Sequence, residues 1–222
     1  MRLLLCLFFL AATEISFGQS WDTIPRLPEH YRKRLEQFRK EKERPGAILF
    51  LGNSITEGGN WQKLLADTTA LNRGIGGDIT FGLLQRLDEV VRHQPRKLFL
   101  LIGINDLSKG IPEEVVLQNT FVIVSKLRRE LPNTRIYVQS ILPVNPSFKN
   151  FPAGYALQQQ VEVVNTQLKK IQARFGYTYI DLFSRFLDKQ GVLEATLSTD
   201  GLHLNAAGYQ RWVEVLKEEN CL

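Results

Sequence analysis

Ser54 directly follows a short apolar segment, a setting in which a serine could act as a nucleophile. In FLGNSITEGG (50–59) the apolar residues stop at Gly52, and polar residues follow at once. A serine hydroxyl is a poor nucleophile at neutral pH unless a histidine lies within hydrogen-bond reach and a carboxylate orients that histidine. The stretch alone is equally compatible with an ordinary strand-to-loop turn, so the rest of the chain must decide.

His203 is the histidine best placed to serve such a serine. Asp200 precedes it by three residues in TDGLHLN (199–205), and this spacing lets the carboxylate reach the Nδ1–H of the ring while Nε2 faces the serine. Taken alone, the pair is more often a capped turn beside an interior histidine. The other two histidines, His30 and His93, lie in charged helical segments without a motif around them.

Acyl transfer also needs hydrogen-bond donors for the negative charge that develops on the carbonyl oxygen. The glycine-rich stretch NRGIGGD (72–78) can present backbone N–H groups without side-chain obstruction. Asn105, in GIND (103–106), can add a side-chain amide. The alternatives are that the glycines only form a tight turn before Asp78, which we expect to cap a helix, and that Asn105 only bonds its own loop.

Five apolar runs bounded by turn residues predict strands that are buried on both faces. They are 47–51, a segment around Leu71, 97–103, 135–142 and 177–182. Apolar residues at helical spacing predict helices over 29–44, 78–92, 112–129, a segment ending near 175, and 206–219. This alternation predicts an α/β fold in which a parallel sheet is covered by helices on both faces and the polar clusters meet at the carboxyl edge of the sheet.

The four clusters, in this order, resemble the blocks of the SGNH hydrolases, also called the GDSL esterase/lipase family. They read FLGNSIT, NRGIGGD, GIND and DGLHLN, and the resemblance covers about residues 46–222. It implies a three-layer α/β/α sandwich on a five-stranded parallel sheet, of the flavodoxin-like type. No metal or organic cofactor is implied.

The resemblance also implies a role for each candidate residue. Ser54 would be the nucleophile of a triad that Asp200 and His203 complete. The N–H groups of Ser54 and Gly77 and the side-chain amide of Asn105 would form the oxyanion hole. The second glycine of the Gly-x-Ser-x-Gly elbow typical of α/β-hydrolases is missing here, since Thr56 stands two residues after the serine.

Asn53 departs from the family pattern, which usually has Asp before the serine. Asparagine keeps one acceptor oxygen and loses the charge. Because the position is not part of the triad, we expect activity to be retained, with a changed pH profile or loop rigidity.

The substrate is less tightly defined by the sequence than the chemistry. NSITEGGNW and GIGGD resemble the branch of the family that holds platelet-activating-factor acetylhydrolase-like proteins and bacterial carbohydrate or sialate O-acetylesterases. The prediction is an esterase for O-acetyl or other short-chain esters, acting on carbohydrates. One alternative is a lysophospholipase or thioesterase, in which the loop 143–155 lines an acyl channel rather than packing on the surface. Another is a non-catalytic carbohydrate-binding relic of the fold.

The N-terminus predicts export. Arg2 precedes the apolar run 3–12, and Ser16-Phe17-Gly18 resembles a signal-peptidase site. We expect residues 1–18 to be a cleaved signal peptide, 19–45 a helical lead-in and 46–222 the hydrolase domain, located in the periplasm or outside the cell. The apolar run is shorter than the roughly 20 residues that span a bilayer, so no stable membrane span is expected after cleavage.

Composition excludes several classes of partner and site. The net charge is +5, but the basic residues between 32 and 44 alternate with glutamates, which favours a solvated helix over a nucleic-acid surface. Cleavage would remove Cys6 and leave Cys221 alone, which excludes an intramolecular disulfide and a cysteine-based zinc site. No feature of the sequence indicates an oligomeric state, and the expected partner is a small-molecule or glycan ester.

Overall fold

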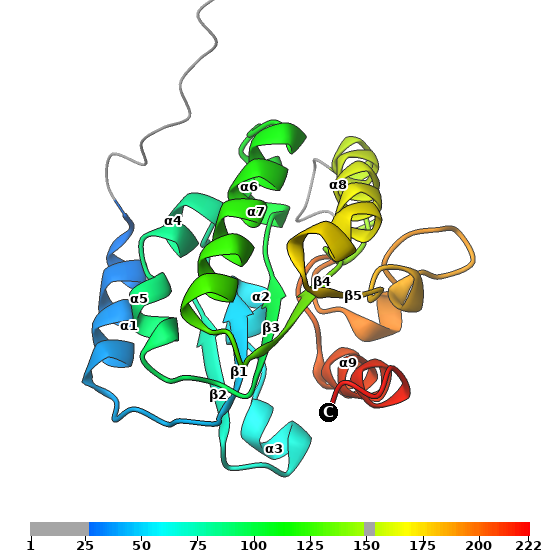
Figure 1. Cartoon of the computed structure of the whole chain (residues 1–222). Coiled ribbons are helices and arrows are strands. Elements are labelled where there is room, and N and C mark those ends of the chain that lie inside the picture. The colour runs from blue at the N-terminus through cyan, green and yellow to red at the C-terminus, as the bar shows by residue number, and fades with distance from the viewer. Residues whose placement is uncertain (1–26, 149–153) are drawn as a thin grey trace, which may run out of the picture.

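A computed structural model describes residues 27–148 and 154–222, so the predicted signal peptide lies outside the described residues. The described chain forms one parallel five-stranded sheet between two layers of helices (Figure 1). The strands are β1 (Ile48–Gly52), β2 (Ala70–Gly74), β3 (Lys97–Leu101), β4 (Arg135–Gln139) and β5 (Thr178–Ile180), in the spatial order β2-β1-β3-β4-β5. The predicted α/β/α sandwich is confirmed.

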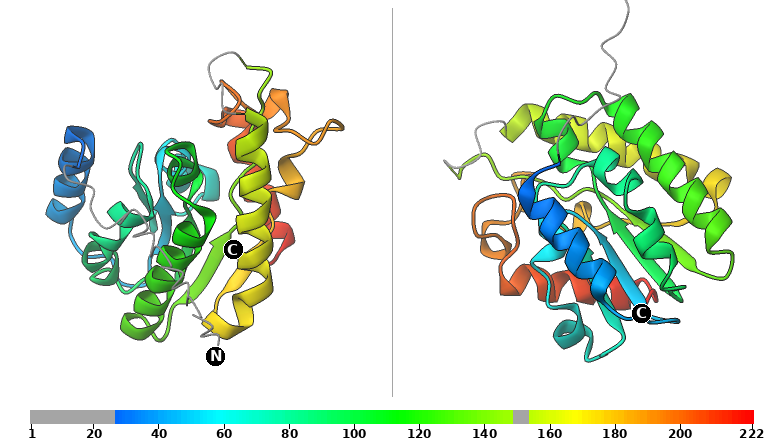
Figure 2. Two further views of the ribbon diagram at one scale, coloured as in Figure 1. Left: turned by 90° about the horizontal axis from the view of Figure 1, so that it is seen from above. Right: turned by 90° about the vertical axis from the view of Figure 1, so that its left-hand side faces the viewer.

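The helices divide between the two faces of the sheet. They are α1 (Glu29–Lys40), α2 (Ser54–Glu57), α3 (Trp61–Leu65), α4 (Thr80–Leu84), α5 (Leu87–Val91), α6 (Ile104–Ser108), α7 (Glu113–Glu130), α8 (Gly154–Phe175) and α9 (Ala206–Glu218). Figures 1 and 2 show α4, α5, α7 and α8 on one face, with α1 outside α4 and α5, and α3 and α9 on the other. Among the described residues, no helix has the length and apolarity that a bilayer span requires.

A row of aromatic rings across the strands fixes the α3/α9 face. Phe50, Phe99 and Tyr137 occupy matching register positions on β1, β3 and β4, and their rings stack at centroid distances of 4.9 Å and 4.7 Å. Trp61 of α3 stacks on Phe50 at 3.7 Å, and Trp212 of α9 meets Trp61 edge-on at 4.9 Å. Large buried rings of this kind make the end of β1 a rigid support.

The prediction of one helix over 78–92, capped by Asp78, is wrong. The segment forms two short helices, and Ile79 occupies the cap position of α4 without a side-chain cap bond. Asp78 is instead buried beside Arg86, with Oδ2 2.9 Å from Nη2. Arg86 lies between the two helices with φ −130° and ψ 16°, which turns its guanidinium inward toward the carboxylate and interrupts the helix.

Candidate active site

Ser54 is placed at the sheet edge by a sharp turn between β1 and α2. A Cβ on Gly52 would lie 2.3 Å from both Leu101 O and Thr56 Oγ1, so only glycine fits here. Asn53 caps α2, because its Oδ1 accepts a hydrogen bond of 3.0 Å from Ile55 N–H. Ser54 is then the first residue of α2, and the helix leaves its N–H without an intrahelical acceptor.

His203 and Asp200 meet Ser54 in the arrangement that the sequence predicts. Ser54 Oγ lies 3.0 Å from His203 Nε2, and His203 Nδ1 lies 2.7 Å from Asp200 Oδ2. The other carboxylate oxygen, Oδ1, accepts the N–H groups of Leu202 at 3.0 Å and His203 at 2.7 Å. The loop therefore fixes the carboxylate by its own backbone before the carboxylate fixes the ring.

The Asp200 carboxyl is held in its charged form. Burial raises its pKa, but hydrogen bonds from the His203 ring and from the N–H groups of His203 and Leu202 outweigh this effect, so the pKa lies below its usual value. A charged Asp200 keeps the proton of His203 on Nδ1 and leaves Nε2 free to accept the proton of Ser54.

Residues 75–78 follow β2, and we call them the oxyanion loop. Ile75 N–H donates to Gly52 O and Asp78 N–H donates to Ile75 O, both at 3.1 Å. Gly77 is exposed, with φ +74°, and its N–H has no acceptor among the described residues. This N–H is therefore available to a substrate oxygen.

Asn105 lies beside the same loop. Its Nδ2 donates a hydrogen bond of 2.9 Å to Asp78 O, which leaves its second amide proton for another acceptor. This bond joins α6, which follows β3, to the loop after β2, so Asn105 does more than bond its own segment. Ser54, Gly77 and Asn105 thus come from three neighbouring strand ends.

Two buried carboxylates, Asp78 in the oxyanion loop and Asp106 in α6, are not identified as site residues by the sequence. Asp106 accepts hydrogen bonds from Thr80 N–H at 3.0 Å and Thr80 Oγ–H at 2.6 Å. Burial raises the pKa of Asp106 to about 6, against the opposing effect of these bonds. Burial also raises the pKa of Asp78 to about 6, although Arg86 opposes the shift. The signals in the sequence are the places of Asp78 within NRGIGGD and of Asp106 within GIND.

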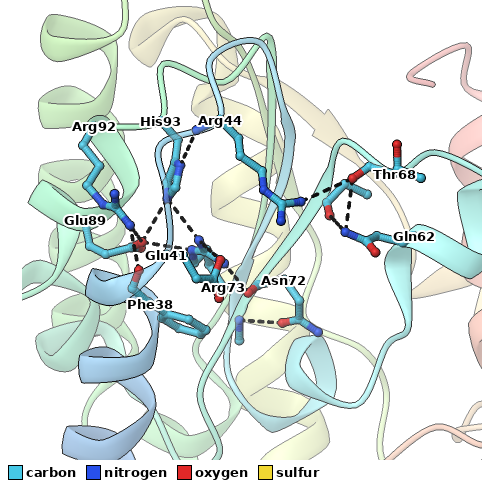
Figure 3. Close-up of polar contacts among 12 residues, drawn as sticks. Phe38, Glu41, Arg44, Gln62, Thr68, Asn72, Arg73, Glu89, Arg92 and His93 are labelled. Carbon is cyan, nitrogen blue, oxygen red and sulfur yellow. Dashed lines mark hydrogen bonds and ion pairs between the residues drawn. The ribbon is translucent and has the colours of Figure 1, made fainter.

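The other two histidines have partners of their own. His30 Nε2 lies 3.1 Å from Glu57 Oε2. His93 is fully buried: its Nδ1 accepts Arg44 N–H at 3.1 Å, and its Nε2 lies 3.0 Å from Glu89 Oε1 (Figure 3). Among the described residues, neither histidine forms a hydrogen bond to Ser54.

The loop 143–155 is described only in part. Its first half packs against the Asp200–His203 loop, because Asn145 is buried and its N–H donates to Gly201 O at 2.8 Å. Phe151 and Pro152 lie outside the described residues. Within the parts of the chain that the structure describes, no cluster of three or more His, Cys, Asp or Glu residues could hold a metal ion, and Cys221 is a buried free thiol.

A serine bonded to a histidine that is bonded to an aspartate, at the carboxyl edge of a parallel sheet, is the geometry of a serine hydrolase on an α/β/α sandwich. Residues 50–211 match the model of the GDSL-like Lipase/Acylhydrolase family. The chain belongs to this family and is a carboxylic ester hydrolase.

Individual relatives agree with this assignment. The rat platelet-activating factor acetylhydrolase IB subunit alpha2 is 28% identical over 215 residues, covering 94% of this chain and 86% of that protein. A solved Streptococcus pneumonia protein assigned as a platelet activating factor is 32% identical, with a TM-score of 0.78, over 86% of this chain and 92% of its own. An acetylxylan esterase from Geobacillus stearothermophilus, solved as a catalytic mutant, shares the fold at 16% identity, with a TM-score of 0.65 over 80% of this chain and 95% of its own.

Proposed function

We propose that this protein is an exported serine esterase that removes acetyl or other short acyl groups from carbohydrate esters. The observation that carries the proposal is the continuous chain of contacts from Ser54 Oγ through His203 to the Asp200 carboxylate, at 3.0 Å and 2.7 Å. Neither bond is needed to complete a helix or a strand, which favours a chemical over a purely structural role.

In the proposed reaction, Ser54 Oγ attacks the ester carbonyl while His203 Nε2 accepts its proton. The N–H groups of Ser54 and Gly77 and the amide of Asn105 stabilise the tetrahedral oxyanion. Collapse of this intermediate expels the alcohol, which takes the proton from His203, and leaves an acyl group on Ser54. A water molecule, deprotonated by His203, then releases the acid and restores the serine.

Support for a short acyl group comes from the relatives. A platelet-activating factor acetylhydrolase and an acetylxylan esterase are both named for the removal of acetyl groups, from very different alcohols. The preference for a short acyl group is therefore the better supported half of the proposal. The residues before 19 indicate export, and an exported enzyme favours extracellular glycans as the source of the alcohol.

The direct test is turnover of p-nitrophenyl acetate by the mature chain and by Ser54→Ala, with a serine-directed phosphonate as inhibitor. We expect turnover that the phosphonate abolishes and that Ser54→Ala lacks. Turnover that is unchanged in Ser54→Ala would contradict the proposal. The rate of hydrolysis should be highest for the short esters in a series of acetate, butyrate, octanoate and laurate. The protein should then also act on acetylated sialic acids or xylans. A rate that is highest for octanoate or a longer ester would favour a lysophospholipase.

Asn105→Ala tests the oxyanion hole. Loss of one donor should lower kcat by about 10²–10³-fold with little change in KM, because the bond is made in the transition state. A change confined to KM would assign Asn105 to substrate binding instead.

A further inference from the structure

Glu57 lies at the end of α2, one helical turn after Ser54, and its carboxylate contacts the oxyanion loop. Oε2 accepts a hydrogen bond of 2.5 Å from Gly76 N–H. A Cβ on Gly76 would lie 3.1 Å from this oxygen and 3.4 Å from His30 Nε2, so the backbone approaches both side chains closely. The bond to Glu57 fixes the peptide immediately before the one that carries the Gly77 N–H.

Two side chains of α1, those of His30 and Arg34, contact the same carboxylate. His30 Nε2 lies 3.1 Å from Oε2, and Arg34 Nε lies 3.3 Å from Oε1. An unbalanced carboxylate bonded next to Gly77 would repel the negative charge that develops on a substrate oxyanion. The Arg34 cation offsets this charge and keeps Glu57 directed at Gly76.

Ile75, the first residue of the oxyanion loop, packs against α1 rather than the main core. It is fully buried, and together with Tyr31, Leu35 and Phe38 it forms a separate apolar cluster. Burial of an isoleucine side chain stabilises the folded state, so this contact resists movement of the loop away from the helix. The loop is thus attached to α1 by apolar packing as well as through Glu57.

The far end of α1 is itself anchored to the sheet, as Figure 3 shows. Phe38 O accepts a hydrogen bond of 2.6 Å from Arg92 Nη2. Glu41 lies 2.8 Å from Arg73 Nη2, and Arg73 is 1% exposed. Because Arg92 and the buried Arg73 hold its C-terminal end, α1 can serve as a fixed reference for the loop at its N-terminal end.

We propose that α1, which precedes the family match at residues 50–211, is part of the active site, and that Glu57 is the positioning residue through which it sets the Gly77 N–H. This inference rests on the proposed function, because the direction of that N–H matters only if a substrate oxyanion forms there. Glu57 does not touch substrate; it acts through Gly76.

The test compares Glu57→Ala, Glu57→Gln and Arg34→Gln in the mature chain with p-nitrophenyl acetate. Misplacing a catalytic donor should lower kcat of Glu57→Ala by about 10–100-fold, with KM nearly unchanged. Glu57→Gln keeps an acceptor oxygen for Gly76 N–H and should restore most of the lost kcat. Arg34→Gln should show a smaller fall.

Glu36→Gln is the matched control, since Glu36 pairs with Lys40 at 2.7 Å on the exposed surface of α1. It should leave kcat and KM unchanged. A fall in kcat that Glu57→Gln fails to restore, or an effect on KM alone, would overturn the positioning role. A Glu57→Ala variant with wild-type kcat would overturn it too.

Amide hydrogen exchange at Gly76 separates this inference from the proposed function. Exchange should be faster in Glu57→Ala than in the wild type, and unchanged in Glu36→Gln. If the wild type shows no turnover, the proposed function fails, and the exchange rate alone decides whether Glu57 holds the loop. Unchanged exchange at Gly76 in Glu57→Ala overturns the inference in either case.

Discussion

The two halves of the active site are built in different ways. On one side, the Asp200–His203 loop holds its carboxylate and its imidazole through bonds that span three residues or fewer. On the other side, the oxyanion loop is held by partners far along the chain: Gly76 by Glu57, 19 positions away, and Asp78 by Asn105, 27 positions away. The first half depends on local chain geometry, and the second depends on the whole fold.

The two halves also differ in how deeply their side chains are buried. The side chains of His203 and Asp200 are 39% and 34% exposed, whereas those of Arg86 and Asp78 are 0% and 1% exposed. Removing a partner from the exposed half should therefore change the chemistry and leave stability nearly intact. Removing one from the buried half should lower stability as well, because a charge is left without compensation inside the protein.

His203→Ala should give the largest effect on activity. Loss of the base should lower kcat by about 10⁴-fold, by analogy with other serine triads, while the melting temperature stays close to that of the wild type. Kinetics with p-nitrophenyl acetate and a thermal melt measure both quantities on one preparation. Near-normal kcat would remove His203 from the triad, and a large fall in melting temperature would contradict the distinction between the halves.

Arg86→Met should give the largest effect on stability. Arg86 Nε donates to Asp78 Oδ2 and Nη2 donates to Gly52 O, both at 3.0 Å, so it joins the loop after β2 to the end of β1. Breaking a buried pair by removing one partner costs about 3–5 kcal/mol. The matched control is Arg129→Met, which removes an exposed pair with Glu130 and should cost about 0–1 kcal/mol. Equal losses in urea denaturation would refute the contrast.

The same contrast explains which parts of the site could be predicted from the sequence. Ser54, Asp200 and His203 stand next to strand ends or three residues apart, so local patterns and a parallel sheet were enough to expect their meeting, and the structure brings them together. Arg86 is one of several polar residues between the apolar positions of 78–92, and nothing in the sequence distinguishes it from the others. Its burial, and the break it causes in the predicted 78–92 helix, depend on contacts with Gly52 and Asp78 that the local periodicity does not encode.

Asp106→Asn should change how the stability of the protein depends on pH, because Asp106 is a buried carboxyl group. The pKa of Asp106 is about 6 in the folded protein, against the ordinary value of 3.8, so the folded state binds its proton more tightly than the unfolded state does. The wild type should therefore lose stability, relative to Asp106→Asn, as pH rises from 3.8 to about 6. The expected loss is about 3 kcal/mol.

The measurement is the free energy of unfolding of both proteins in urea at several pH values. The pKa values of Asp200 and Glu89 are lowered, so their contributions to stability are lost in the opposite direction, as pH falls. These contributions are the same in both proteins and cancel in the difference between them. Asparagine adds a constant offset, because its amide nitrogen faces a donor. Parallel curves for the two proteins would show that Asp106 titrates normally.

Asn53→Asp should give the smallest effect, at the junction of the two halves. Asn53 is fully buried; its Oδ1 caps α2, while its Nδ2 has no partner among the described residues. Arg86 Nη1 also lacks a partner within the described chain, and its Nη2 bonds Gly52, the residue before Asn53. An unsatisfied buried donor costs about 1–3 kcal/mol, so replacing Nδ2 with an acceptor should stabilise the protein by about 1 kcal/mol and leave kcat little changed.

The matched control for this change is Asn60→Asp. Asn60 caps α3 through Oδ1, at 3.2 Å from Lys63 N–H, but it is exposed, and aspartate caps a helix about as well as asparagine. The free energy of unfolding of the Asn60→Asp variant should therefore equal that of the wild type. If Asn53→Asp instead lowers the free energy of unfolding, the Arg86 guanidinium is already balanced by Asp78 alone. A second carboxylate beside Ser54 would then be an uncompensated buried charge, and asparagine would be the better residue for this chain.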